Sequence, residues 1–133
     1  MPWWGYLTVV MIFVVVYLFS TYNAVVKLRN QVGESWSGVD VQLRRRRDLV
    51  PNLVAAVAAY AKHEAQVLEL VTDSRTMAES ASHAGPAQAA KAENTLTGSL
   101  RGLFVVAENY PQLKADGNFM QLQKELVSIE NNV

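Results

Sequence analysis

The stretch WWGYLTVVMIFVVVYLFSTY, residues 3–22, sets the architecture of this 133-residue chain. It carries no charged side chain, and it is as long as a helix must be to cross a hydrocarbon core of about 30 Å. Its aromatic residues gather towards both ends, where amphipathic rings prefer the headgroup layer. They are Trp3, Trp4, Tyr6, Tyr17 and Tyr22. We expect residues 1–22 to form a transmembrane anchor and residues 23–133 a helical domain.

Two alternatives to the anchor remain. A cleaved signal peptide would have a basic start and a small-residue cleavage site, and neither is clear here. A buried core helix would show a polar stripe, which this stretch lacks. The flanking charges predict the orientation, because Lys27 and Arg29 follow the stretch closely and no basic side chain precedes it. By the positive-inside rule, the N-terminus lies outside and residues 23–133 lie in the cytoplasm.

Beyond the anchor, apolar residues recur at helical spacings. The first stripe is heptad-like, which is typical of a coiled coil, and only Arg29 interrupts it. Its members are Tyr22, Val25, Val32, Trp36, Val39 and Leu43. Asp48 and Pro51 are typical of a helix start, so the sequence predicts a second helix from this point to about Ala81.

Two more helical stripes follow the breaker at residues 83–86, and they are separated by Pro111 and a turn at residues 114–117. The apolar residues of the second helix include Leu53, Val57, Val71, Met77 and Ala78. No segment alternates as a strand would. The sequence therefore predicts an all-α fold, in which an N-terminal transmembrane helix continues into an antiparallel bundle of about four long helices.

The composition excludes several classes of function. The 12 basic and 12 acidic side chains cancel, whereas a general nucleic-acid binder would carry a basic excess. The absence of cysteine excludes a disulfide framework and a thiolate nucleophile. The pair His63-Glu64 fails the HExxH pattern of zinc proteases, because position 67 is valine. We expect no catalytic residues, no metal site and no cofactor.

The charges are divided unevenly along the chain. Residues 27–47 hold six basic and two acidic side chains, whereas the rest of the chain holds six basic and ten acidic ones. Arg44 lies 25 residues beyond Phe19, about 38 Å along a continuous helix, which is too far for its own bilayer to serve as the counter-charge. A solvated helix end is one interpretation of the arginine run, and a salt-bridged contact between subunits is the one we favour. The candidate oligomer interface is Trp36, Asp40, Arg44, Arg45, Arg46 and Arg47.

Four other polar residues fall on or beside the apolar stripes. Because no cleft or activated nucleophile is suggested by their spacing, we expect a structural role rather than acid–base chemistry. The candidate buried polar network is Glu64, Arg75, Glu93 and Asn94.

The chain after the anchor resembles the LemA family of bacterial membrane-anchored proteins. The segments that carry the resemblance include ESWSGVDVQL at residues 34–43, RRDLVPNLV at 46–54, AEN at 92–94 and NF-x-x-LQ-x-EL-x-x-IEN at 118–131. Members of the family usually continue for some tens of residues beyond this point. The resemblance implies an N-terminal transmembrane helix, a helical domain and no established enzymatic activity.

A related protein of magnetotactic bacteria, MamQ, is associated with formation of the magnetosome membrane, which makes membrane organisation the function that the resemblance suggests. We therefore expect a non-enzymatic, self-associating scaffold of the bacterial cytoplasmic membrane. Its expected partners are the lipid bilayer and further copies of the chain. The alternative is an adaptor or regulatory subunit for another membrane protein, such as a protease or a signalling receptor.

Overall fold

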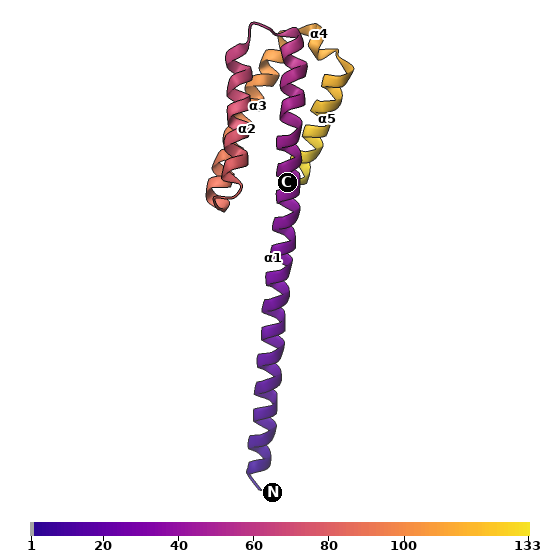
Figure 1. Ribbon diagram of the computed structural model, residues 1–133. Helices are drawn as coiled ribbons and strands as arrows, with labels where there is room; N and C mark the ends of the chain where they lie inside the picture. Colours follow the sequence, from indigo (N-terminus) through magenta and orange to yellow (C-terminus); the bar gives the residue numbers. More distant parts are fainter. Residues whose placement is uncertain (1) are drawn as a thin grey trace. The chain divides into compact units, whose positions relative to one another are not determined.

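The computed structural model describes residues 2–133, and all regular secondary structure in that range is helical, as expected from the sequence (Figure 1). Four helices are long, and one consists of a single turn. The helices are α1 (Trp4–Tyr60), α2 (Ala65–Ala81), α3 (Pro86–Glu108), α4 (Pro111–Lys114) and α5 (Gly117–Asn132).

The chain divides into two compact units, Met1–Gly38 and Val39–Val133. The described part of the first unit consists almost entirely of the N-terminal part of α1, whose large apolar side chains are exposed. Among residues 2–133, α1 is the one helix long and apolar enough to cross a membrane. The second unit contains the rest of α1 and the other four helices.

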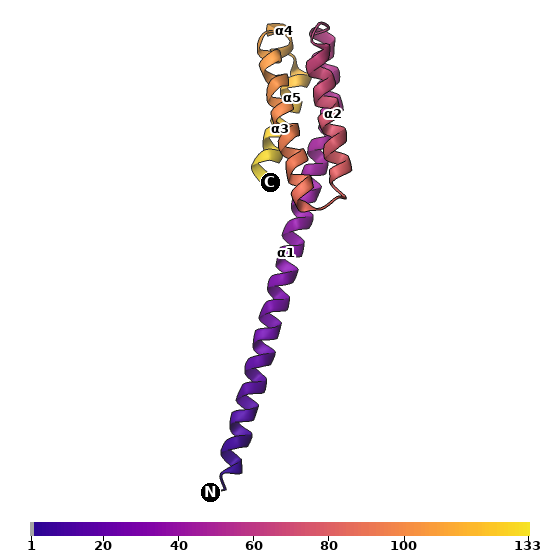
Figure 2. The same cartoon turned by 90° about the vertical axis from the view of Figure 1, so that its left-hand side faces the viewer.

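The second unit is an antiparallel bundle. From residue 39 onward α1 runs towards one end of the bundle, α2 returns, α3 runs back alongside α2, and α5 returns again after the α4 turn (Figures 1 and 2). The short connections at residues 61–64 and 82–85 allow only this reversal between neighbouring helices.

A single hydrophobic core lies along the bundle. Every helix of the unit contributes buried apolar residues, and Phe104 and Phe119 add a tilted ring contact with 6.2 Å between centroids. The core includes Val50, Leu53 and Val57 of α1, Val71 and Ala78 of α2, Leu96, Leu100 and Leu103 of α3, Leu113 of α4, and Leu122 and Leu126 of α5.

The predicted helix boundary at Asp48–Pro51 is wrong, because α1 passes through Pro51 and ends at Tyr60. Proline has no N–H group, so the carbonyl of Arg47, four residues earlier, loses its helical donor. The side chain of Arg75 in α2 replaces it, and Arg75 Nε donates to the Arg47 oxygen at 3.3 Å. The reversal that the sequence placed before Pro51 lies instead at residues 61–64.

The other predicted boundaries agree with the structure. Gly85 ends the α2–α3 connection with φ at +116°, a conformation open mainly to glycine, and Pro86 starts α3. Asp116 caps α5, since its carboxylate accepts a hydrogen bond of 3.0 Å from the Phe119 N–H.

Candidate functional site

A cluster of charged and polar groups with a buried centre joins α1 to α3 and α5. We call Arg46, Arg47, Glu93, Thr97 and Glu130 the arginine cluster. Arg47 Nη1 donates to Glu93 Oε1 at 2.6 Å, and Arg46 Nη1 lies 3.6 Å from Glu93 Oε2. Arg46, Arg47 and Glu93 are each only 6% exposed. Glu93 therefore neutralises part of the charge of two buried guanidinium groups.

The remaining partners of Arg46 complete the cluster. Its Nη2 atom donates to Thr97 Oγ1 at 2.6 Å and lies 3.4 Å from Glu130 Oε1. The Thr97 hydroxyl in turn donates to the Glu93 backbone oxygen at 3.0 Å, which fixes its orientation. Because a buried charge is costly unless it is paired, these contacts hold α1 in one register against α3 and α5.

The arginine cluster corrects the prediction for the arginine run. The sequence predicts Arg46 and Arg47 at an interface between subunits, but they are buried within their own chain. Their neighbours Arg44 and Arg45 are exposed, as are Trp36 and Asp40. The bundle thus uses two of the four arginines internally and leaves the other two on its surface.

The four residues of the predicted polar network lie in different surroundings. Glu93 is buried within the arginine cluster, and Arg75 is half-buried, where it contacts the Arg47 carbonyl and pairs with Glu79 at 3.2 Å. Glu64 and Asn94 lie outside the arginine cluster. Glu64 accepts a long hydrogen bond of 3.4 Å from the Tyr110 hydroxyl, and Asn94 is exposed on α3.

A second polar contact ties the end of α1 to the start of α5. The Tyr60 hydroxyl donates to Asp116 Oδ2 at 2.8 Å. This hydrogen bond, with the negative charge beside it, raises the pKa of Tyr60. The Phe119 N–H and then the Tyr60 hydroxyl lower the pKa of Asp116 by stabilising its carboxylate. The contact is therefore complete between the two pKa values, with Tyr60 neutral and Asp116 ionised.

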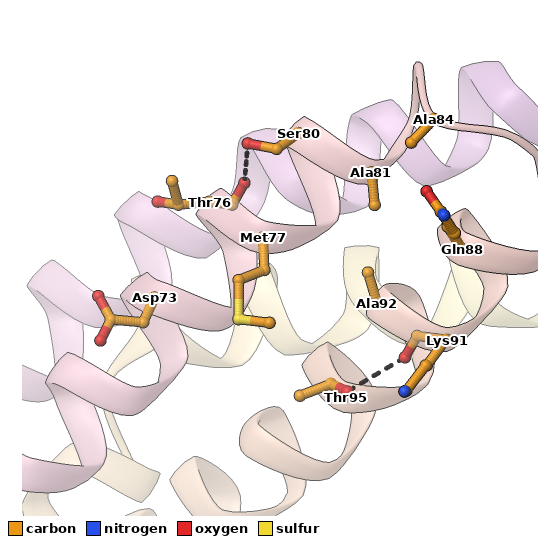
Figure 3. A pocket seen from close by; sticks show the side chains of 10 residues that line it. All are labelled: Asp73, Thr76, Met77, Ser80, Ala81, Ala84, Gln88, Lys91, Ala92 and Thr95. Atoms are coloured by element: carbon orange, nitrogen blue, oxygen red, sulfur yellow. Dashed lines mark hydrogen bonds between the residues drawn. The ribbon is translucent and has the colours of Figure 1, made fainter.

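An open groove of about 720 Å³ lies between α2 and α3. Met77 projects from α2, and Ala92 and Thr95 of α3 lie opposite it (Figure 3). Met77, which the sequence places on an apolar helical stripe, is 58% exposed. The other lining residues are Asp73, Thr76, Ser80, Ala81, Ala84, Gln88 and Lys91.

The LemA family profile matches residues 35–133, from the middle of α1 to the end of the described helices. The chain belongs to the LemA family. This membership confirms the resemblance carried by the sequence segments. A search of curated proteins finds no significant match.

The LemA match contains the whole arginine cluster, including two members that the sequence analysis missed. Thr97 lies four residues after Glu93 on the same face of α3, a spacing that could have indicated it. Glu130 lies 84 residues from Arg46, and nothing in the local sequence connects them. Ser74 and Ser99, whose hydroxyl oxygens lie 2.6 Å apart between α2 and α3, were missed for the same reason.

Proposed function

We propose that this LemA-family protein is a non-enzymatic, membrane-anchored scaffold, whose copies associate side by side to organise or remodel the bacterial cytoplasmic membrane. In this proposal the apolar segment of α1 spans the bilayer with its N-terminus outside, and the bundle lies on the cytoplasmic side. The observation that carries the proposal is the exposed apolar segment at the start of α1, continuous in one helix with a segment of the bundle.

Charge placement supports the anchor's orientation. Lys27 and Arg29 follow the apolar segment within a few residues, and the side chains of the span itself are uncharged. Positive flanks are retained on the cytoplasmic side during insertion. Trp3 and Tyr22 lie at opposite ends of the apolar segment, at the depth that suits amphipathic rings.

The arginine cluster supports a structural role for the buried charges. Glu93 pairs with both buried arginines, and these ion pairs fix the register of α1 against α3. The surface arginines Arg44 and Arg45 remain free to attract acidic side chains of a neighbouring copy, since the chain beyond residue 47 carries the acidic excess.

The deciding experiment is the mass and shape of the full-length protein, extracted in mild detergent at low salt. Light scattering at micromolar concentration gives the mass, and electron imaging gives the shape. Regular homo-oligomers are expected. A protein that stays monomeric under these conditions would contradict the scaffold.

The α2–α3 groove favours a second candidate, an adaptor that presents its bundle to another membrane protein. An exposed methionine suits an adaptable contact with an apolar side chain of a partner. This candidate predicts a small hetero-complex of defined stoichiometry when intact cells are crosslinked. Replacing Met77 by Lys should abolish that complex, whereas replacing the exposed Glu69 on the same helix should not.

A further inference from the structure

From Tyr22 to Val57 the a and d positions of α1 follow one heptad register, and they are apolar except at Arg29 and Arg46. Within the bundle, Val50, Leu53 and Val57 occupy the a and d positions of this register and are buried by the chain itself. Towards the N-terminus, Val39 and Leu43 follow the same register and are half-buried. The stripe is therefore a packing surface in the part of α1 where a partner exists.

The same register continues through residues 22–36, where the chain leaves it uncovered. Val25, Val32 and Trp36 are 58%, 63% and 54% exposed, and Tyr22 is 69% exposed. Over two heptads a straight helix drifts by only about 40° from the ideal repeat, so these side chains lie along one face, which Arg29 interrupts. We call Tyr22, Val25, Val32 and Trp36 the open seam.

Charged side chains avoid the sides of the open seam. Lys27 and Glu34 both fall on the f position, the one farthest from the stripe. The flanking e and g positions hold Val26, Leu28, Gly33 and Ser35, none of which is charged. An identical helix can therefore approach in parallel without placing like charges in contact along these flanks.

We infer that the open seam binds the open seam of a second copy of this chain, as a parallel, in-register coiled coil. The inference rests on the proposed function, because two copies anchored in one membrane by the same span present these residues in the same direction and at the same depth. Each seam residue then faces its own counterpart, and the copies are joined between the anchor and the bundle.

Arg29 occupies one a position of the open seam and weakens its packing. Two arginines facing each other weaken a coiled coil, and a single polar a position fixes its register. The aliphatic part of each side chain lies along the seam while the guanidinium group reaches outward. Replacing Arg29 by Leu should therefore raise the oligomeric fraction at a given protein concentration.

The test uses disulfide crosslinking, for which the cysteine-free chain is well suited. Single cysteines are placed in the full-length protein in its membrane at Val25 and Val32, and control cysteines at Lys27 and Glu34 on the opposite face. A disulfide requires Cα atoms within about 7 Å, a distance that a and d positions of a parallel pair reach and f positions do not. Oxidation should produce covalent dimers of V25C and V32C, with several-fold less for K27C and E34C.

The mass of each variant before oxidation separates the inference from the proposed function. Homo-oligomers without preferential crosslinking at Val25 and Val32 would overturn the seam and leave the scaffold standing. Monomers before oxidation would overturn both. Equal crosslinking on both faces would indicate random collision, and dominant crosslinking at Lys27 and Glu34 would place the contact on the other face, so either result also overturns the inference.

Discussion

Pro51 and Arg75 form a compensating pair at the scale of single residues. Pro51 removes the donor of the Arg47 carbonyl, and the Arg75 side chain supplies another from α2. The Arg47 carbonyl keeps this donor only while α2 is docked. The contact therefore couples the integrity of α1 to the packing of its neighbour.

Replacing Arg75 by Ala should lower the free energy of unfolding by about 1 kcal/mol, because it leaves the Arg47 carbonyl without a donor. In a Pro51→Ala background the loss should be smaller, since the restored N–H of residue 51 can bond that carbonyl. Urea denaturation of the detergent-solubilised protein, followed by circular dichroism, measures both. The control is Glu79→Ala, which removes only the Arg75–Glu79 pair. Equal losses in the two backgrounds would refute the coupling.

Glu93 is the buried acid that the two guanidinium groups share. Replacing Glu93 by Gln should destabilise the bundle by about 3 kcal/mol, because both buried arginines lose their nearest charge. The matched control is Glu130→Gln, whose side chain is 46% exposed, and its loss should stay below about 1 kcal/mol. The same denaturation experiment compares them, and similar losses would argue against a charge lock centred on Glu93.

At the scale of the element, α1 contains two glycines near its middle, Gly33 and Gly38, that its neighbours do not require. A Cβ atom built on Gly33 or Gly38 meets nothing within 4 Å, and neither residue needs a positive φ. Gly38 is also the last residue of the first compact unit. By propensity alone, each of these positions is therefore a weak point of the helix, although less so than Pro51.

Replacing Gly33 or Gly38 by Ala should stabilise the surrounding helix by about 1 kcal/mol each. Hydrogen exchange of the nearby amides should slow about fivefold if they exchange by local opening. Gly85→Ala is the opposite case, because φ at +116° strains any residue with a Cβ, and it should lower the stability of the bundle. Unchanged exchange in both α1 variants would contradict the expected weakness.

Most of the helical segments could be predicted from local sequence, whereas the break at residues 61–64 and the short helix α4 could not. Apolar periodicity identified the helical segments, and Gly85, Pro86 and Asp116 marked their ends through local backbone chemistry. Pro51 misled because its compensation is not local. The donor that permits a proline inside α1 comes from Arg75, 28 residues away from the carbonyl that it satisfies.

At the scale of the whole molecule, the four consecutive arginines divide between interior and surface. The uneven charge distribution predicted a contact between basic and acidic segments, but it could not say whether that contact lies within one chain. Glu93 meets Arg47 over a separation of 46 residues, which only the folded bundle reveals. The charged residues can be found in the sequence. That Arg46 and Arg47 form ion pairs within their own chain is known only from their burial in the folded bundle.

Because Arg46 and Arg47 are buried, a test of electrostatic association between copies should change only Arg44 and Arg45. Replacing Arg44 and Arg45 by Gln should weaken self-association by between about twofold and tenfold and reduce its dependence on salt, because exposed ion pairs are individually weak and screened. The matched control is Arg101→Gln with Lys124→Gln, which removes the same charge from other exposed sites. Sedimentation at two salt concentrations measures the effect, and equal behaviour of the two variants would leave Arg44 and Arg45 without a specific part.

The buried guanidinium groups also constrain the order in which the protein can fold during its synthesis. A ribosome completes α1 before it makes the residues that α1 needs, since the Arg47 carbonyl waits 28 residues for Arg75 and the Arg47 side chain waits 46 for Glu93. Until then, this part of α1 must remain hydrated. A chain whose synthesis stops before residue 93 lacks the acid that pairs with both arginines, and one that stops before residue 75 also lacks the donor to the Arg47 carbonyl. Such incomplete chains are favoured substrates of cellular proteases.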